Sequence, residues 1–298
     1  MDIRFVPAEE IVRNKWNGCV HYATNGNVFG YQWYLNNVAK EWDALIEGDY
    51  QSVFPLIWKE DFFKRKGLYQ PPLVREAGLY SVNALSPKRV KNFLQAIPEE
   101  YKSIEVHLNE RIALPDNLDF KEEQLLNYQL AINENIETLE AAFTEELKAN
   151  LHKAKTAQLQ AVSNLKPEVL ADFYKKYSHH KDKSDFNFHA LQRLMYNAMH
   201  RGVGFISGVV DQQQKLCAIN FFIYSHNKIL SLVPLASPYG WEHAALPFMF
   251  NVLLQTNAGR PLIIDFNVGQ SQDWVKGFGA KANSYSRITK GLKKWKLF

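Results

Sequence analysis

The sequence contains few cysteines. Its 298 residues include 2, Cys19 and Cys217, which lie far apart and have apolar or small neighbours. A disulfide framework needs several cysteines, and a CxxC site needs two that are close together, so neither is expected. We expect both cysteines to be small core residues and the protein to work in a reducing compartment.

Long apolar runs are also absent. No run approaches the ~20 residues that a membrane-spanning helix requires. No apolar signal-peptide segment follows Met1. We therefore predict a cytoplasmic protein without a membrane span.

Several families of catalytic motif are missing. The sequence has no HExxH zinc motif, no GxSxG nucleophile elbow and no Walker phosphate loop. His179, His180 and His189 come closest to a metal cluster, but their spacing fits no standard site and we expect them to be solvated. The sequence thus predicts no metal cofactor.

What is present is an ordinary globular composition. Hydrophobic residues make up 46% of the chain, and the net charge of +4 is too mild to predict nucleic-acid binding by itself. A chain of this length has room for two domains of roughly 150 residues. Polar residues over 109–124 mark a boundary, so we predict an N-terminal domain over 1–124 and a C-terminal domain over 125–298.

Both halves mix strands and helices. In the first half, Trp42–Glu47 and Tyr50–Trp58 are typical of a hairpin. Leu68–Leu73 reads as a short strand broken by two prolines, either at a sheet edge or where the chain leaves the sheet, and Ser86-Pro87 begins a helix. The second half predicts strands over 203–210, 215–224 and 228–233, a loop over 236–240, a helix to about 258, and a last strand over 281–288.

One stretch near the C-terminus organises the second half. Leu262–Phe266 is a short apolar run that predicts a buried strand, and Asp265 and Asn267 lie at its C-terminal end. Ser271 is the expected cap of a short helix that Gly279 ends. A polar pair at the carboxyl end of a buried strand lies where open α/β sheets bind ligands.

This order of elements resembles the core of the GNAT acyltransferases. Three features are similar to the FemAB-like branch, in which two GNAT-like domains lie in one chain: Asp265-Phe266 with the later Phe278-Gly279, the basic helix Leu147–Lys155, and the helix start Leu170–Tyr174. The resemblance implies an α/β (α+β) fold of two GNAT-like domains. Each would be a mixed, mostly antiparallel sheet flanked by helices, with a cleft between the domains and a degenerate N-terminal member.

The sequence departs from the GNAT pattern at the donor loop. The resemblance places the pyrophosphate loop within Pro234–Ala245, which has one glycine, Gly240. Backbone N–H groups hold a diphosphate, and Pro238 and Pro247 remove two of them. This argues against the usual GNAT mode of coenzyme A binding. An acyl-CoA donor stays open, and aminoacyl-tRNA, which many FemAB-like proteins use, is the alternative.

The resemblance and the strand order together nominate the site residues. The candidates for proton transfer and substrate orientation are Asp265, Glu242 and Tyr239. The candidates for binding the donor are Asn220, Tyr224, Gly240 and Asn267. The candidates for binding the substrate are Trp33, Tyr69, Gln70, Lys153 and Tyr285. Structural roles stay open beside these: Asp265 could bond the following turn, Glu242 could favour a helix dipole, and Lys153 could be an exposed helix lysine.

The predicted function follows from this set. We expect an acyl- or aminoacyl-transferase that moves an acyl group to a small-molecule or peptide amine by direct attack. The alternative is a catalytically silent GNAT-fold module that binds a peptide or a cell-envelope precursor. The sequence leaves the donor, the acceptor and the oligomeric state open.

Overall fold

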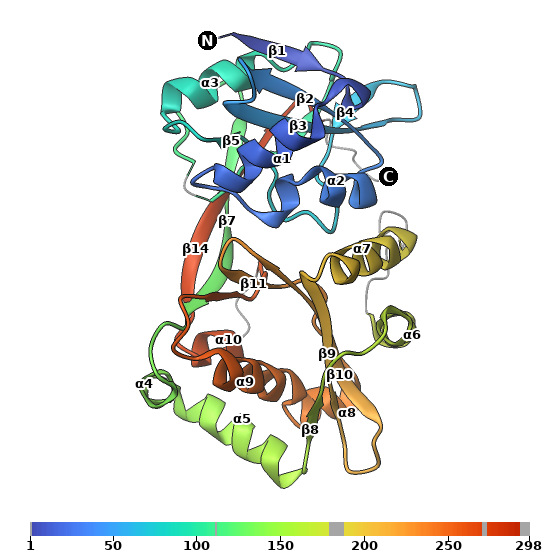
Figure 1. Cartoon of the computed structure of the whole chain (residues 1–298), viewed down its shortest axis with the longest axis vertical. Coiled ribbons are helices and arrows are strands. Elements are labelled where there is room, and N and C mark those ends of the chain that lie inside the picture. Colours follow the sequence, from blue (N-terminus) through green and yellow to red (C-terminus); the bar gives the residue numbers. More distant parts are fainter. Residues whose placement is uncertain (1, 111, 179–187, 270–272, 293–298) are drawn as a thin grey trace, which may run out of the picture. The chain divides into compact units, whose positions relative to one another are not determined.

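The computed structural model describes residues 2–110, 112–178, 188–269 and 273–292. Two compact units make up the chain (Figure 1). Unit 1 comprises Met1–Leu125 with Ser284–Phe298, and unit 2 comprises Leu126–Asn283. Most of the last strand therefore packs with unit 1, whereas the sequence assigned it to the C-terminal domain. The division into GNAT-like domains at residue 124, and the cleft between them, stay predictions.

Unit 1 is built on an antiparallel sheet with the strand order β1-β2-β3-β4, in which β5 also pairs with β3. The elements in chain order are β1 (Ile3–Val6), η1 (Ala8–Glu10), α1 (Arg13–Tyr22), η2 (Val28–Gly30), α2 (Gln32–Val38), β2 (Glu41–Glu47), β3 (Ser52–Glu60), β4 (Lys66–Leu68), β5 (Tyr80–Ser81), α3 (Pro87–Gln95) and β6 (Ile104–His107). The end of the last strand, β14 (Lys281–Lys290), pairs antiparallel with β6.

Local signals account for most of these elements. The predicted hairpin is confirmed, because β2 and β3 pair from Glu47↔Ser52 onward. Ser86 caps α3 as predicted, its hydroxyl accepting a hydrogen bond from the Arg89 backbone N–H. The predicted strand over Leu68–Leu73 is wrong in its bounds: β4 ends at Leu68, since the two prolines that follow cannot donate to a ladder.

Unit 2 contains a larger sheet with the strand order β7-β13-β11-β10-β9-β8, in which β12 also pairs with β10. Its elements are β7 (Lys121–Ala131), α4 (Ile136–Ala141), α5 (Glu145–Thr156), β8 (Gln160–Val162), α6 (Pro167–Tyr177), α7 (Phe188–His200), β9 (Gly204–Val210), β10 (Leu216–Ser225), β11 (Lys228–Ser231), β12 (Leu235–Ala236), α8 (Pro238–Glu242), α9 (Ala245–Asn257), β13 (Ile263–Asp265) and α10 (Asp273–Gly277). The boundaries between the units fall within β7 and β14.

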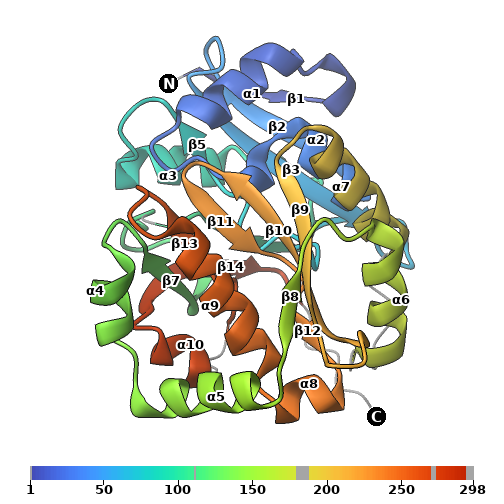
Figure 2. The same ribbon diagram turned by 60° about the horizontal axis from the view of Figure 1, so that its bottom comes forward.

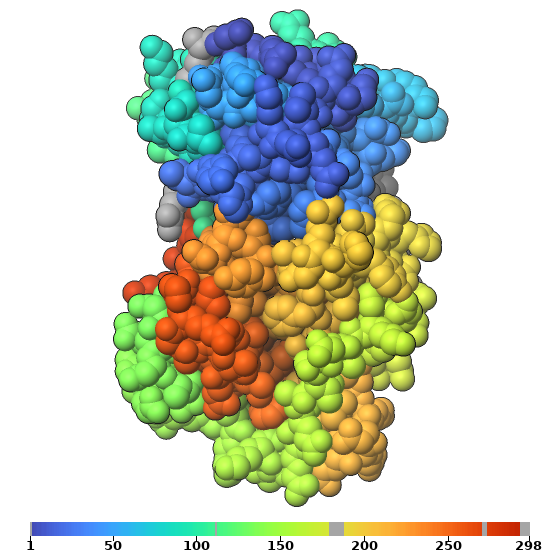
Figure 3. Space-filling model, viewed as in Figure 1, coloured from blue at the N-terminus to red at the C-terminus, as the bar shows by residue number. Residues whose placement is uncertain are grey.

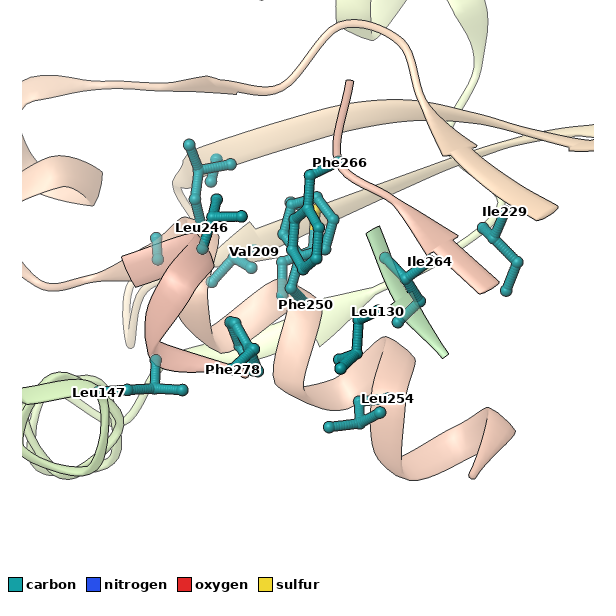
Figure 4. Close-up of a cluster of buried hydrophobic side chains, with 14 of the residues drawn as sticks. Leu130, Leu147, Val209, Ile229, Leu246, Phe250, Leu254, Ile264, Phe266 and Phe278 are labelled. Atoms are coloured by element: carbon teal, nitrogen blue, oxygen red, sulfur yellow. The ribbon is translucent and has the colours of Figure 1, made fainter. Parts of the chain in front are cut away.

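One face of the unit 2 sheet packs on α9. Leu130, Ile264 and Ile229 are paired across three neighbouring strands and join one hydrophobic cluster with Phe250 and Leu254 of α9 (Figures 2 and 4). Side chains alternate between the faces of a strand, so the residues next to these three point away from α9.

Helix α7 packs against the other face of the sheet. Phe222 of β10 has its ring 5.7 Å from that of Phe250 on α9, so its neighbour Phe221 points the opposite way. A Cβ atom at Gly204 would lie 3.0 Å from the Phe221 ring and 2.7 Å from Ala198 of α7. The glycine thus lets α7 lie close to β9.

Two predicted features lie outside the described residues. These are the helix cap at Ser271 and the histidine pair His179 and His180. In the described part of the chain, no group of three or more His, Cys, Asp or Glu side chains is placed to hold a metal ion.

Candidate functional site

Strands β11 and β13 of unit 2 run parallel and separate at their carboxyl ends. The pairing of β11 with β13 stops at Leu230↔Asp265. The chain that leaves β11 stays beside β10, where the Leu232 N–H donates to a backbone carbonyl. The chain that leaves β13 stays beside β7, where the Phe266 N–H donates to a backbone carbonyl. Ligands of open α/β sheets bind where neighbouring strands diverge at their carboxyl ends.

A row of polar side chains crosses the sheet at this point. Asp265 on β13 lies opposite Gln129 on β7, and Asn127 lies two residues further along β7. Asp265 and Asn127 are both 0% exposed. Asn283, at the start of β14, extends the row by donating to the Gln129 side-chain oxygen at 3.4 Å. Because Ile264 faces α9, this polar row occupies the opposite face of the sheet.

Donors from β7 and from the following turn hold the Asp265 carboxylate. Its Oδ1 accepts from Asn127 Nδ2 at 2.9 Å and from the Asn267 backbone N–H at 3.0 Å. Its Oδ2 accepts from Gln129 Nε2 at 2.9 Å. The bond to Asn267 closes a turn and holds that residue at a φ of 54°, which asparagine tolerates better than most residues. The structural role that the sequence left open for Asp265 is therefore present.

Asn127 leaves one strong acceptor unused. Its side-chain Oδ1 is buried and has no hydrogen-bond partner among the residues that the structure describes. A buried acceptor without a donor costs about 1–3 kcal/mol, so its presence beside Asp265 indicates a place for a ligand that donates hydrogen bonds.

Sequence reasoning missed Asn127, Gln129 and Asn283. The alternation of polar and apolar residues in Leu125–Ile132 is a visible signal that one face of β7 is polar. The proximity of Asn127 and Gln129 to Asp265 comes from pairing between strands that are more than 130 residues apart in sequence, and local patterns do not report such pairing.

The predicted donor loop is folded differently from the expectation. Residues 236–240 were expected to form a loop, but Pro238 starts the short helix α8, which is capped by the Ser237 hydroxyl accepting from the Gly240 N–H at 3.1 Å. The N–H groups of Trp241 and His243 donate to carbonyls of the same segment. These donors are therefore engaged internally.

Gly240 itself serves the packing of this segment. A Cβ atom there would lie 2.1 Å from the Cys217 carbonyl oxygen of β10. Only glycine lets α8 approach the strand so closely. Its predicted role in donor binding stays a prediction.

Tyr239 and Glu242 lie on the outer side of α8. The Tyr239 ring stacks on His243 at 4.0 Å between centroids and borders a pocket of about 300 Å³ that Lys215 and Cys217 also line. Glu242 is exposed to solvent. Both are accessible, but they are not part of the polar row around Asp265.

Asn220 and Tyr224 have different surroundings although both lie on β10. Asn220 is 0% exposed; its Nδ2 donates to the Ser231 hydroxyl and its Oδ1 accepts from the Val233 N–H. This ties β10 to the segment that follows β11. Tyr224 is exposed and lines a pocket of about 350 Å³ together with Arg260.

The remaining predicted substrate residues lie elsewhere. Lys153 is an exposed residue in the last turn of α5. The other four belong to unit 1: Trp33, Tyr69, Gln70 and Tyr285.

Within unit 1 these four side chains make internal contacts. Gln70 donates to the Val74 carbonyl and accepts from the His107 N–H. The Tyr285 ring lies 5.8 Å from that of His107, and the Tyr69 hydroxyl accepts from a backbone N–H. Trp33 packs edge-on against its neighbour Tyr34. Their roles in substrate binding stay predictions.

Several solved structures share this architecture. A structure of FemX matches with a TM-score of 0.66 and 10% identity, covering 96% of this chain and 97% of that one. L-PGS from Bacillus licheniformis matches with a TM-score of 0.57 and 12% identity, over 94% and 92% of the two chains. A tandem GNAT protein from the clavulanic acid biosynthesis pathway matches with a TM-score of 0.54 and 9% identity, over 97% and 98%.

These similarities confirm the predicted fold. The chain has the tandem GNAT fold, with two sheets flanked by helices, and it is similar to FemX over nearly its whole length. No protein-family model and no curated protein matches the sequence. No helix among the described residues is both long and apolar enough to cross a membrane.

Proposed function

We propose that the protein transfers an acyl or aminoacyl group to an amine at the carboxyl ends of β11 and β13. The proposal is supported by the tandem GNAT fold, which it shares with FemX, L-PGS and a tandem GNAT protein. The observation that carries it is the buried polar row, in which the unpartnered Asn127 oxygen lies beside the Asp265 carboxylate.

The chemistry of that row suits an amine. An amine donates hydrogen bonds, and the row offers a free amide oxygen and a carboxylate as acceptors. In the proposed step the amine nitrogen attacks the carbonyl carbon of a thioester or ester. A C–N bond forms, the C–S or C–O bond breaks, and the thiol or hydroxyl leaves with a proton. Asp265 takes the proton that the amine loses and passes it to the departing sulfur or oxygen, which restores the carboxylate.

The donor is the open part of this proposal. Acyl-CoA and aminoacyl-tRNA both carry a carbonyl that an amine can attack. The internal bonding of the α8 segment and the missing N–H of Pro247 leave few backbone groups for a diphosphate. This favours aminoacyl-tRNA, a cytoplasmic donor, with a small-molecule or peptide amine as the acceptor.

The first test is replacement of the carboxylate. Once a donor and an amine acceptor give a product by mass spectrometry, Asp265→Asn should lower kcat by about 10²- to 10⁴-fold, because the base for the amine proton is lost. Its thermal unfolding should be measured in parallel, since Asp265 also bonds within the fold. The exposed Asp273→Asn is the matched control and should keep full activity. A folded Asp265→Asn protein with unchanged kcat would contradict the assignment.

A second candidate function is a binding module that holds a peptide or envelope precursor without chemistry. The observation that favours it is again the α8 segment, whose hydrogen bonds are satisfied internally. Calorimetric titration with coenzyme A and acetyl-CoA, followed by charged tRNA, separates the two. A transferase should bind one donor with a Kd in the micromolar range, about −8 kcal/mol. Absence of binding to every donor would favour the module.

A further inference from the structure

The hairpin between β3 and β4 ends in two exposed phenylalanines. Phe62 is 92% exposed and Phe63 is 65% exposed, and their rings meet edge to face at 5.5 Å. Within the described ranges, Phe62 is the most exposed large hydrophobic side chain. The hairpin, drawn in light blue, projects from the surface of unit 1 (Figures 1 and 3). Adjacent exposed apolar side chains of this size mark an interaction site.

The turn that carries them is firmly bonded. Asp61 Oδ1 accepts from the N–H groups of Phe63 and Arg65, and Oδ2 accepts from two nitrogens of the Arg65 guanidinium at 2.8 and 2.6 Å. The backbone of Asp61 also exchanges hydrogen bonds with Lys64 and Arg65. The hydrogen bond from the Arg65 side chain holds the pKa of Asp61 below its ordinary value, so the pair stays charged. The phenylalanines are therefore presented by an ordered turn.

Cations surround the tip. Residues 59–66 contain Lys59, Lys64, Arg65 and Lys66 against two carboxylates. Lys64 pairs with Glu60 at 3.3 Å, Arg65 with Asp61 at 2.6 Å, and Lys66 with Glu100 at 3.4 Å. The Lys59 ammonium lies 4.7 Å from the Tyr69 ring centroid, and the Lys66 ammonium lies 4.6 Å from the Trp58 ring centroid. Four cations against two carboxylates leave residues 59–66, behind the apolar tip, with a net charge of +2.

We propose that this hairpin docks the protein on an anionic lipid bilayer, with the two phenylalanines in the interfacial region and the lysines against the headgroups. Aromatic side chains are favoured at the membrane–water interface, and each basic residue near an anionic surface adds attraction. The narrow tip suits insertion between lipids better than a protein interface, which buries about 800 Å² on each partner. The proposal is independent of the reaction assigned to unit 2.

The test uses the full chain and lipid vesicles. Sedimentation should show binding to vesicles of mixed phosphatidylglycerol and phosphatidylcholine, and at least about tenfold weaker binding to phosphatidylcholine alone. Phe62→Ser with Phe63→Ser should lower the partition coefficient for anionic vesicles by about tenfold or more. The matched control, Phe62→Leu with Phe63→Leu, keeps an apolar tip and should retain most of the binding. Both side chains are exposed, so thermal unfolding should be unchanged in each variant.

Three outcomes would overturn the proposal. The first is a wild-type chain that binds neither vesicle. The second is a serine variant that binds anionic vesicles as well as the wild type, because another basic surface would then be responsible. The third is sedimentation equilibrium showing a wild-type dimer that the serine pair converts to a monomer, without vesicle binding, which would make the tip a self-association surface.

Discussion

At the scale of single residues, burial determines the chemistry of the two thiols. Desolvation raises the pKa of Cys19 to about 12 and that of Cys217 to about 11. Both side chains are buried, and Cys217 donates to the Val209 carbonyl. The thiol form therefore dominates at physiological pH, and because the thiolate is the nucleophile, neither cysteine is suited to covalent catalysis.

We predict that the folded protein resists thiol reagents. At pH 8 a disulfide reagent that releases a coloured thiolate should react with far fewer than two thiols per chain, and the rate should rise only as the pH approaches 11. Denaturant at pH 8 should expose both thiols at once. Rapid labelling of the native protein at pH 8 would show that one of the sites opens or is more acidic than its burial implies.

Individual residues also show which parts of the candidate site could be predicted from the sequence. Asp265 could be chosen from sequence because it ends a buried strand, a local signal. Its donors Asn127 and Gln129 could not be paired with it, because hydrogen bonds across strands depend on topology. The internal bonds of Asn220 escaped prediction for the same reason.

At the scale of elements, α8 is held by its cap and by one close backbone contact. The Ser237 cap fixes its first turn, and Gly240 rests against the β10 backbone at Cys217. This contact involves a carbonyl group, which cannot rotate away as a flexible side chain could.

We predict that Gly240→Ala destabilises the protein by about 1–3 kcal/mol, because the new methyl group forces α8 away from β10. Gly18→Ala is the comparison: it lies within α1, a Cβ atom there meets nothing within 4 Å, and helix propensity should make it neutral or stabilising by up to about 1 kcal/mol. Chemical denaturation of both variants measures the difference. Equal stabilities would mean that α8 shifts freely.

A helix start could be predicted where the residues that cap it are adjacent in sequence. Ser86 was predicted to begin a helix, and its hydroxyl accepts the expected backbone hydrogen bond. The helix α8 escaped prediction because one turn is too short to show hydrophobic periodicity. Its Ser237-Pro238 start is a local cap signal that the sequence does contain. The pair Pro71-Pro72 was expected to break the strand over Leu68–Leu73, but β4 already ends at Leu68, before the pair.

At the scale of the whole molecule, the two units differ in the number of sequence segments that form them. Unit 2 is one uninterrupted segment, whereas unit 1 needs residues from both ends of the sequence. Ile288 of β14 is 0% exposed and belongs to the hydrophobic cluster of unit 1 with Phe54 and Phe93. A composition shift near residue 124 could suggest one boundary, but it gives no sign that the segment from Ser284 onward belongs to unit 1.

We predict that Ile288→Ala lowers the stability of unit 1 by about 2–5 kcal/mol, the cost of truncating a fully buried isoleucine. Hydrogen exchange should show faster exchange in peptides from residues 2–110, with little change in 126–178 and 188–269. The exposed Lys281→Ala, on the same strand, should change neither region. Loss of protection confined to residues 126–178 and 188–269 would contradict the division into units.

The discontinuity of unit 1 has a consequence for synthesis on the ribosome. Domains usually fold in the order in which they emerge, the N-terminal one first. Here the segment over 2–110 emerges early but must wait for β14 to pair with β6, because that strand follows the whole of unit 2 along the chain. Unit 2 has all of its residues available by Asn283 and can complete first. The nascent segment over 2–110 thus keeps an unfilled core while unit 2 is translated, and the cell's chaperones would meet it in that state.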